Sequence, residues 1–293
     1  MILRRRKGRA WAHTAAATGW GESTYAELAW DRSRSAGLRW GLFGAVVGVL
    51  VALVAFAPAS WLAGAVASAT NEHVLLGDAR GTVWSGSAVV VLTGGPGSRD
   101  ASALPGRMEW TLGLKGLALE LRARQACCLN GTTSVLVRPG LGRVTIQVPP
   151  SPGWLGQWPT AWLSGLGTPW NTLQMGGAIR LASQGLTLES VQGRWRVQGR
   201  ADVDLLDVSS RVSTLETLGS YRLTLSGDPS GTAQLNLSTQ QGALQLTGNG
   251  TVGPAGVRFR GEARAAGGDE AALANLLNII GRRDGARSVI SIG

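Results

Sequence analysis

The hydrophobic positions of this chain fall into two patterns, and the first is an uncharged stretch that begins at Trp40 and continues to Asn71. A helix rises about 1.5 Å per residue, and it needs about 20 apolar residues to cross the hydrocarbon core of a bilayer. Residues 38–62 supply that length. The pattern therefore predicts one transmembrane helix over residues 38–62.

The second pattern is an alternation of apolar and polar residues that recurs throughout the rest of the chain. Leu117, Leu119 and Leu121 alternate in this way, as do Tyr221 and Leu223. Such alternation gives a strand one apolar and one polar face. Gly-rich and Pro-containing turns separate the runs, which favours antiparallel pairing. We therefore expect a mainly β protein, with one N-terminal membrane helix followed by an antiparallel sheet.

The alternating region divides at residues 149–171, which contain five Pro and four Trp residues. We expect β subdomains over residues 63–148 and 172–293, joined by a Pro/Trp-rich linker with a short helix at residues 160–166. Residues 81–89 and 193–201 share a Gly, Trp, Gly, Ala order, which suggests that the subdomains are related. Coincidence in a Gly-rich chain is the alternative.

A helix is predicted near the C-terminus. Leu273, Leu276, Leu277 and Ile280 form one apolar stripe at helical spacing. Asp269 is suited to the N-cap and Gly281 to the position after the last turn, according to common capping preferences. The alternation over residues 287–292 predicts a closing strand.

Charge is distributed unevenly on the two sides of the uncharged stretch. Of the 28 Lys and Arg residues, eight precede it, with three of the 18 acidic residues. This excess predicts a cytoplasmic basic segment over residues 1–37 and a periplasmic C-terminus. A cleaved signal peptide is the alternative, and residues 1–22 need not be the true N-terminus. The remaining 20 basic and 15 acidic residues form no basic stripe, so we do not expect nucleic-acid binding.

Three small groups of residues are candidate sites. Gly44, Gly48 and Ala52 lie one helical turn apart and would let another membrane helix approach closely, although such spacing also arises by chance in this composition. The adjacent Cys127 and Cys128 could form a vicinal disulfide, remain thiols or bridge two chains. The linker tryptophans could form a partner surface or cap the sheet; they are Trp158, Trp162 and Trp170.

The sequence contains no recognisable catalytic motif. The two histidines, His13 and His73, fall on opposite sides of the predicted span, so they cannot share a site. No phosphate-binding loop or cysteine-based metal motif is present. We therefore expect no enzymatic activity, no cofactor, no metal and no small-molecule substrate.

Several motifs resemble the protein N family of the bacterial type II secretion system. The most characteristic is Gly-Thr-x-Trp-Ser-Gly at residues 81–86. Others are Leu104-Pro105-Gly106, Gly167-Thr168-Pro169-Trp170-Asn171-Thr172-Leu173, Ser210-Arg211-Val212-Ser213-Thr214-Leu215 and Leu276-Leu277-Asn278-Ile279-Ile280-Gly281. The resemblance covers residues 23–293 in order and spacing.

This resemblance implies an accessory component anchored in the inner membrane, with one span and a periplasmic body, that supports export of folded proteins across the outer membrane. Its partners would be the membrane and other secretion components, and the family supplies no catalytic residues. Two alternatives are an AsmA-like lipid-handling protein with an apolar β groove and a periplasmic glycan-binding module. The first would show an uncovered apolar sheet face, and the second would show exposed coplanar tryptophan rings.

Overall fold

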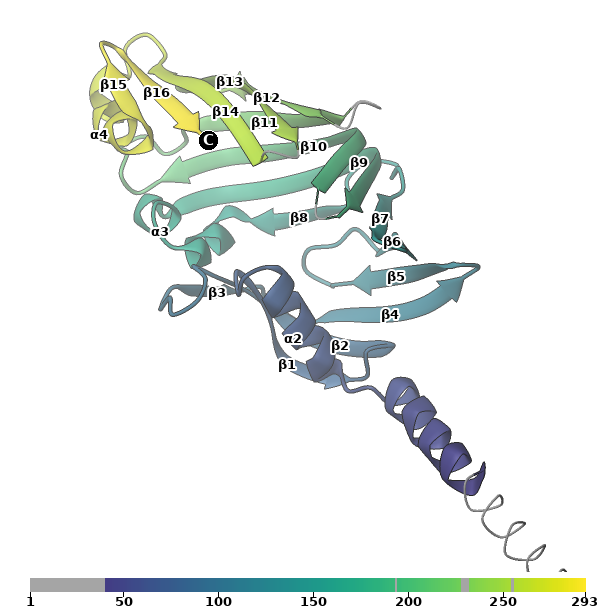
Figure 1. The fold of residues 1–293 in the computed structure, drawn as a ribbon. Coiled ribbons are helices and arrows are strands. Elements are labelled where there is room, and N and C mark those ends of the chain that lie inside the picture. Colours follow the sequence, from purple (N-terminus) through teal and green to yellow (C-terminus); the bar gives the residue numbers. More distant parts are fainter. Residues whose placement is uncertain (1–39, 193, 228–231, 254–255) are drawn as a thin grey trace, which may run out of the picture. The chain divides into compact units, whose positions relative to one another are not determined.

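The computed structural model describes residues 40–192, 194–227, 232–253 and 256–293. These residues belong to two compact units, Met1–Phe56 and Ala57–Gly293. In the first unit, residues 40–55 are helical. The second unit, called the body below, contains the sheet (Figure 1).

The predicted continuous helix over residues 38–62 is wrong at its C-terminal bound. The helix ends at residue 55, Pro58 follows, and a separate helix, α2 (Ala59–Ala69), begins. Proline lacks the N–H that a helix interior needs and disfavours a helical conformation in the preceding residue. Ala57 and Ala59 are buried in the body. Residues 38 and 39 lie outside the described residues. Within the described part of the chain, no helix combines the length and apolar character that crossing a membrane requires.

The body is built on one antiparallel sheet, in which the described residues contribute 16 strands. The strand order is β1-β2-β4-β5-β6-β7-β9-β10-β11-β12-β13-β14-β16-β15, with β3 on β2 and β8 on β9. The strands of the first half are β1 (Val74–Gly81), β2 (Ser85–Thr93), β3 (Ala101–Ala103), β4 (Met108–Lys115), β5 (Ala118–Arg124), β6 (Thr132–Gly140), β7 (Arg143–Val148) and β8 (Gly156–Pro159). Those of the second half are β9 (Met175–Val191), β10 (Arg194–Ser210), β11 (Gly219–Gly227), β12 (Ala233–Gln241), β13 (Leu244–Gly253), β14 (Gly256–Ala265), β15 (Arg282–Asp284) and β16 (Arg287–Ile292).

The two expected subdomains are not structurally separate. β7 pairs directly with the second half of β9, from Arg143 opposite Val191 to Val148 opposite Leu186. The segment 149–171 is not a free linker, because β8 pairs with the first half of β9. It also contains the 3₁₀ helix η1 (Thr160–Leu166), where a short helix was predicted, and the first residues of α3 (Trp170–Leu173). Whether the halves are related in sequence stays a prediction.

The predicted C-terminal elements are confirmed. α4 (Glu270–Ile280) is preceded by Asp269 and followed by Gly281, and β16 covers the predicted closing strand. Leu273, Leu276 and Leu277 are buried in the largest core cluster, against strand residues such as Tyr221 and Leu244. α4 therefore covers one end of the sheet (Figure 1).

The apolar residues of successive strands lie opposite one another on the same face of the sheet. Cross-strand pairs join Leu114 to Leu119, Leu119 to Val137, Val137 to Ile146, Ile146 to Leu188 and Leu188 to Val197. Because paired residues share a face, these six side chains form a continuous line across β4, β5, β6, β7, β9 and β10. We call this line the apolar row.

The other end of the same face is also covered. Ala59 of α2 packs with Ala88 and Trp110. Nearby, Val90, Leu104 and Cys128 form a further buried cluster. The core therefore lies at the two ends of the sheet, and the apolar row lies between them.

Candidate functional site

The Gly-Thr-x-Trp-Ser-Gly motif forms the turn between β1 and β2 and receives the chain from the first unit. The backbone N–H of Val83 donates to the carbonyl of Ala57 at 2.9 Å, and Thr82 forms an isolated antiparallel β-bridge with Pro58. The indole Nε1 of Trp110 donates to the Val83 carbonyl at 3.1 Å. The motif thus fixes the point at which the chain enters the body.

Arg107 holds the irregular part of the adjacent β1–β2 pair. The register of that pair shifts between Gly77 and Arg80, where Asp78 has a φ of 49°. Arg107 donates from Nη1 to Asp78 Oδ2 at 2.7 Å and from Nη2 to the Asp78 carbonyl at 2.6 Å. Hydrogen bonds from Arg80 and then from Arg107 keep the pKa of the Asp78 carboxyl below its usual value. This carboxylate therefore acts as a structural ion-pair partner.

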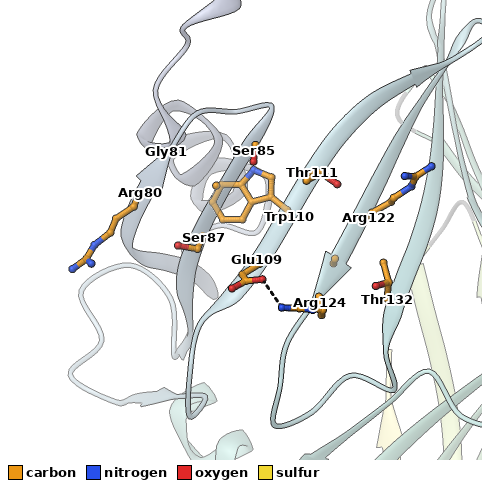
Figure 2. A pocket seen from close by; sticks show the side chains of 12 residues that line it. Arg80, Gly81, Ser85, Ser87, Glu109, Trp110, Thr111, Arg122, Arg124 and Thr132 are labelled. Carbon is orange, nitrogen blue, oxygen red and sulfur yellow. Dashed lines mark hydrogen bonds and ion pairs between the residues drawn. The ribbon is translucent and has the colours of Figure 1, made fainter.

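A shallow pocket of about 510 Å³ lies beside this motif, over β2, β4, β5 and β6 (Figure 2). Its charged side chains are already paired with carboxylates: Arg80 with Asp78, Arg122 with Glu120 and Arg124 with Glu109. Figure 2 shows the last of these ion pairs across the pocket. The other polar groups are serine and threonine hydroxyls, such as those of Ser87 and Thr111. The charged groups that line the pocket are therefore held in ion pairs.

A second pocket, of about 630 Å³, joins two of the motifs that carry the family resemblance. Its lining includes hydroxyl and amide side chains from the α3 region and from the end of β10, together with one charged residue of each sign; these are Ser164, Asn171, Gln174, Ser209, Ser210, Arg211 and Glu216. Groups of this kind form hydrogen bonds with polar partners. The pocket is thus a candidate contact site for another protein.

The three linker tryptophans do not form one exposed surface. Trp158, on β8, and Trp162, on η1, pack against the cluster of Val90, Leu104 and Cys128. The indole Nε1 of Trp162 is buried without a hydrogen-bond partner among the described residues. Trp170 has 36% of its surface exposed. The structure therefore packs two of these rings, partly buried, against the core.

Cys127 and Cys128 are joined by a disulfide. Cys127 is exposed, whereas Cys128 is buried. The carbonyl of Cys128 accepts a hydrogen bond from the Gln157 backbone N–H at 2.7 Å. The pair therefore fixes the turn between β5 and β6 against β8.

The small residues of the first helix lie on its exposed surface. Gly44, Gly48 and Ala52 are all exposed within the first unit. A Cβ atom added at Gly44 or Gly48 would meet no other atom within 4 Å. Their role in packing against another membrane helix stays a prediction.

The alternation predicts which face of each strand is apolar, but it does not predict that these faces join into the apolar row. No described helix makes extensive contact with β6 or β7. Leu114 is 79% exposed, and Leu119, Val137, Ile146 and Leu188 are partly exposed. The opposite face carries polar residues and ion pairs, including Arg143 with Glu189. The sheet therefore has one polar face and one apolar face. The middle of the apolar face is accessible to solvent.

The described residues contain no cluster of three His, Cys, Asp or Glu side chains that could hold a metal ion. The buried phenol of Tyr221 donates to the Leu244 carbonyl at 3.1 Å, and burial raises the pKa of that phenol. Tyr221 therefore has a structural role in the core beneath α4.

Comparison with known proteins agrees with the resemblance seen in the sequence. Neither the curated proteins nor the solved structures give a significant match. A protein-family model described as type II secretion system (T2SS), protein N, matches residues 72–290, well over half of the 293 residues. The chain therefore belongs to the type II secretion system protein N family.

Proposed function

We propose that this protein is an accessory component of the type II secretion system, anchored in the inner membrane by a segment that includes residues 40–56, with its body in the periplasm. The observation that carries the proposal is the family match over residues 72–290. Family membership implies contacts with other secretion components. The body acts as a binding module and not as an enzyme, since its paired arginines and hydroxyl-lined pockets supply no nucleophile with a matching base.

The proposed anchor is supported by the sequence around the first helix. Residues 40–56 are uncharged and include 17 positions, the lower end of the length that spans a bilayer. Arg39 precedes them, and further basic residues lie upstream. Such an excess of Lys and Arg favours retention of the N-terminal side in the cytoplasm.

Alkaline phosphatase fused after Gly293 should be active in intact cells, because that enzyme matures only after export. The measurement is phosphatase activity, compared with a fusion after Arg39, which should be inactive. A fusion after Gly293 that is present in the cell but inactive would exclude the periplasmic location.

Deletion of this protein should reduce the appearance of secreted substrates in the medium while they accumulate, folded, in the periplasm. The measurement is the ratio of medium to periplasmic substrate, with a plasmid copy of the full chain as the control for restoration. Normal secretion in the deletion strain would contradict an active role. Precursors retained in the cytoplasm would indicate a defect before the type II step.

The structure bears differently on the two alternatives. A glycan platform needs exposed rings, whereas Trp158 and Trp162 are partly buried against the core cluster. A lipid-handling protein needs an open apolar surface, and the apolar row is such a surface. Lipid handling is therefore the second candidate function, and it is compatible with a place in the secretion machine.

A further inference from the structure

We propose that the apolar row binds the acyl chain of a phospholipid, taken from the membrane in which the protein is anchored. The inference rests on the anchoring proposed above for the source of the lipid. The binding surface itself consists of the five accessible side chains of the row, Leu114, Leu119, Val137, Ile146 and Leu188, and it ends at the buried Val197.

The chemistry of the row selects an acyl chain over an extended peptide. Each of its side chains is aliphatic, and every strand it crosses is hydrogen-bonded on both sides within the sheet. A peptide lying across these strands would find no partners for its own N–H and C=O groups, and leaving such groups unpaired is costly. An acyl chain has no such groups and needs only apolar contact.

The length of the row also suits this ligand. From Leu114 to Leu188 it crosses four intervals between neighbouring strands, and with a spacing of about 4.8 Å this accessible part spans about 19 Å. One layer of acyl chains fills about 15 Å, which is half of a hydrocarbon core of about 30 Å. A whole acyl chain therefore fits along the row.

The chain enters the body at the hairpin end of the sheet. The β1–β2 turn lies at the same end of the sheet as the turns after β4 and β6. Ala57, which follows the first helix after one residue, is hydrogen-bonded to that first turn. The chain thus enters the body on the side of the sheet that carries the β4–β5 and β6–β7 turns. The apolar row runs close to these turns.

The turns at this end are themselves apolar. Leu117 in the β4–β5 turn is 98% exposed, and Leu141 in the β6–β7 turn is fully exposed, at 106% of its reference area. β4 continues four residues past Thr111, which is paired with Ser85 at the start of β2. At about 3.4 Å per residue this extension projects by about 14 Å. It carries Leu114 and leads into the turn with Leu117, and these exposed side chains would contact acyl chains first.

The test uses photoreactive p-benzoyl-phenylalanine placed in the full chain, in membranes, at one of four positions. Leu119 and Ile146 lie on the apolar row, whereas Glu120 and Thr145 are their sequence neighbours on the opposite face. After irradiation and purification, mass spectrometry measures adducts of phospholipid mass. We expect adducts at positions 119 and 146, at least about tenfold above those at 120 and 145, which corresponds to about 1.4 kcal/mol of preference.

Three outcomes would overturn the proposal. Equal phospholipid labelling on both faces would indicate general contact with lipid. Adducts to another protein at positions 119 and 146 would show that a partner covers the row. Absence of adducts at these positions, in a protein that is folded and present in the membrane, would show that no acyl chain occupies it.

A second pair of variants makes the test independent of the photoreactive group. Ile146→Asp places a charge on the row, and Thr145→Asp places the same charge on the polar face. Phospholipid that co-purifies with the full chain should fall about tenfold or more with Ile146→Asp and remain unchanged with Thr145→Asp. Equal retention by two variants with unchanged thermal unfolding would refute the assignment. Secretion measured in the same strains separates the two proposals, since loss of lipid with normal secretion contradicts only a coupling between them.

Discussion

Leu277→Ala should lower the free energy of unfolding of the body by about 2–5 kcal/mol, the cost typical of emptying a well-packed leucine site. Leu277 is 1% exposed and lies in the core cluster with Leu273, Leu276 and Tyr221. The substitution would leave a cavity between α4 and the sheet. In the unchanged protein, the α4 leucines fill this space by packing against the sheet. Urea unfolding of the purified full chain, followed by tryptophan fluorescence, measures the change.

Ile279→Ala is the matched control on the same helix. Ile279 is 42% exposed, so its truncation should change the free energy of unfolding by no more than about 0.5–1 kcal/mol. Equal losses in the two variants would show that α4 is not packed through its Leu273–Leu277 stripe. This comparison removes helix propensity as an explanation, because both variants introduce alanine into the same helix.

Gly86→Ala should destabilise the body by about 1–3 kcal/mol or more, because the added methyl group has no space. Its Cβ would lie 2.6 Å from the carbonyl oxygen of Arg80, 2.6 Å from Cζ2 of Trp110 and 2.9 Å from the carbonyl oxygen of Thr82. Two of these atoms belong to the backbone, the Arg80 carbonyl in β1 and the Thr82 carbonyl in the turn that is hydrogen-bonded to Ala57. The measurement is the midpoint of urea unfolding.

Gly113→Ala provides the comparison for this prediction. Gly113 lies in β4, and a Cβ atom there would meet nothing within 4 Å. The substitution should be neutral or stabilising by about 0.4–1 kcal/mol, since alanine has less backbone freedom than glycine in the unfolded chain. A Gly86→Ala protein as stable as the Gly113→Ala protein would contradict the packing of Trp110 against the turn.

Local signals were sufficient to predict the strands with clear alternation, such as β5, β11 and β16, and the C-terminal helix. α4 and β16 have the predicted bounds because the leucine stripe and the alternation act over only a few residues, whereas Asp269 makes no side-chain cap hydrogen bond and Gly281 is extended. The apolar stretch continues past Pro58 and therefore predicts a longer helix, whereas the proline favours an end before residue 58, as the structure has it. The uncharged residues 57–62 are partly accounted for by burial of Ala57 and Ala59 in the body.

The continuity of the sheet could not be predicted from the alternation alone. In β9, Ile179 and Leu181 are one residue out of phase with Leu186 and Leu188. A register shift in the β9–β10 pair, between Gly199 and Ala201, returns both pairs to one face. Phase can be read within a strand, but pairing between strands and bulges depends on contacts that are distant in sequence. The apolar row follows from that pairing. The sequence alone therefore predicts an apolar β groove only as one alternative and does not indicate which residues form it.

The nearest-neighbour order of the sheet has a consequence for how the protein is made. From β4 to β14, each strand on the main path pairs with the one before it in the chain, apart from the step from β7 to β9 over β8. A strand that emerges late therefore finds its partner already in place, and only short loops must close. The growing sheet always has one unpaired edge, which invites wrong pairing with other chains until the next strand arrives. For the last long edge, at β14, protection arrives only with β16 and β15, so a chain truncated before residue 282 would keep that edge open.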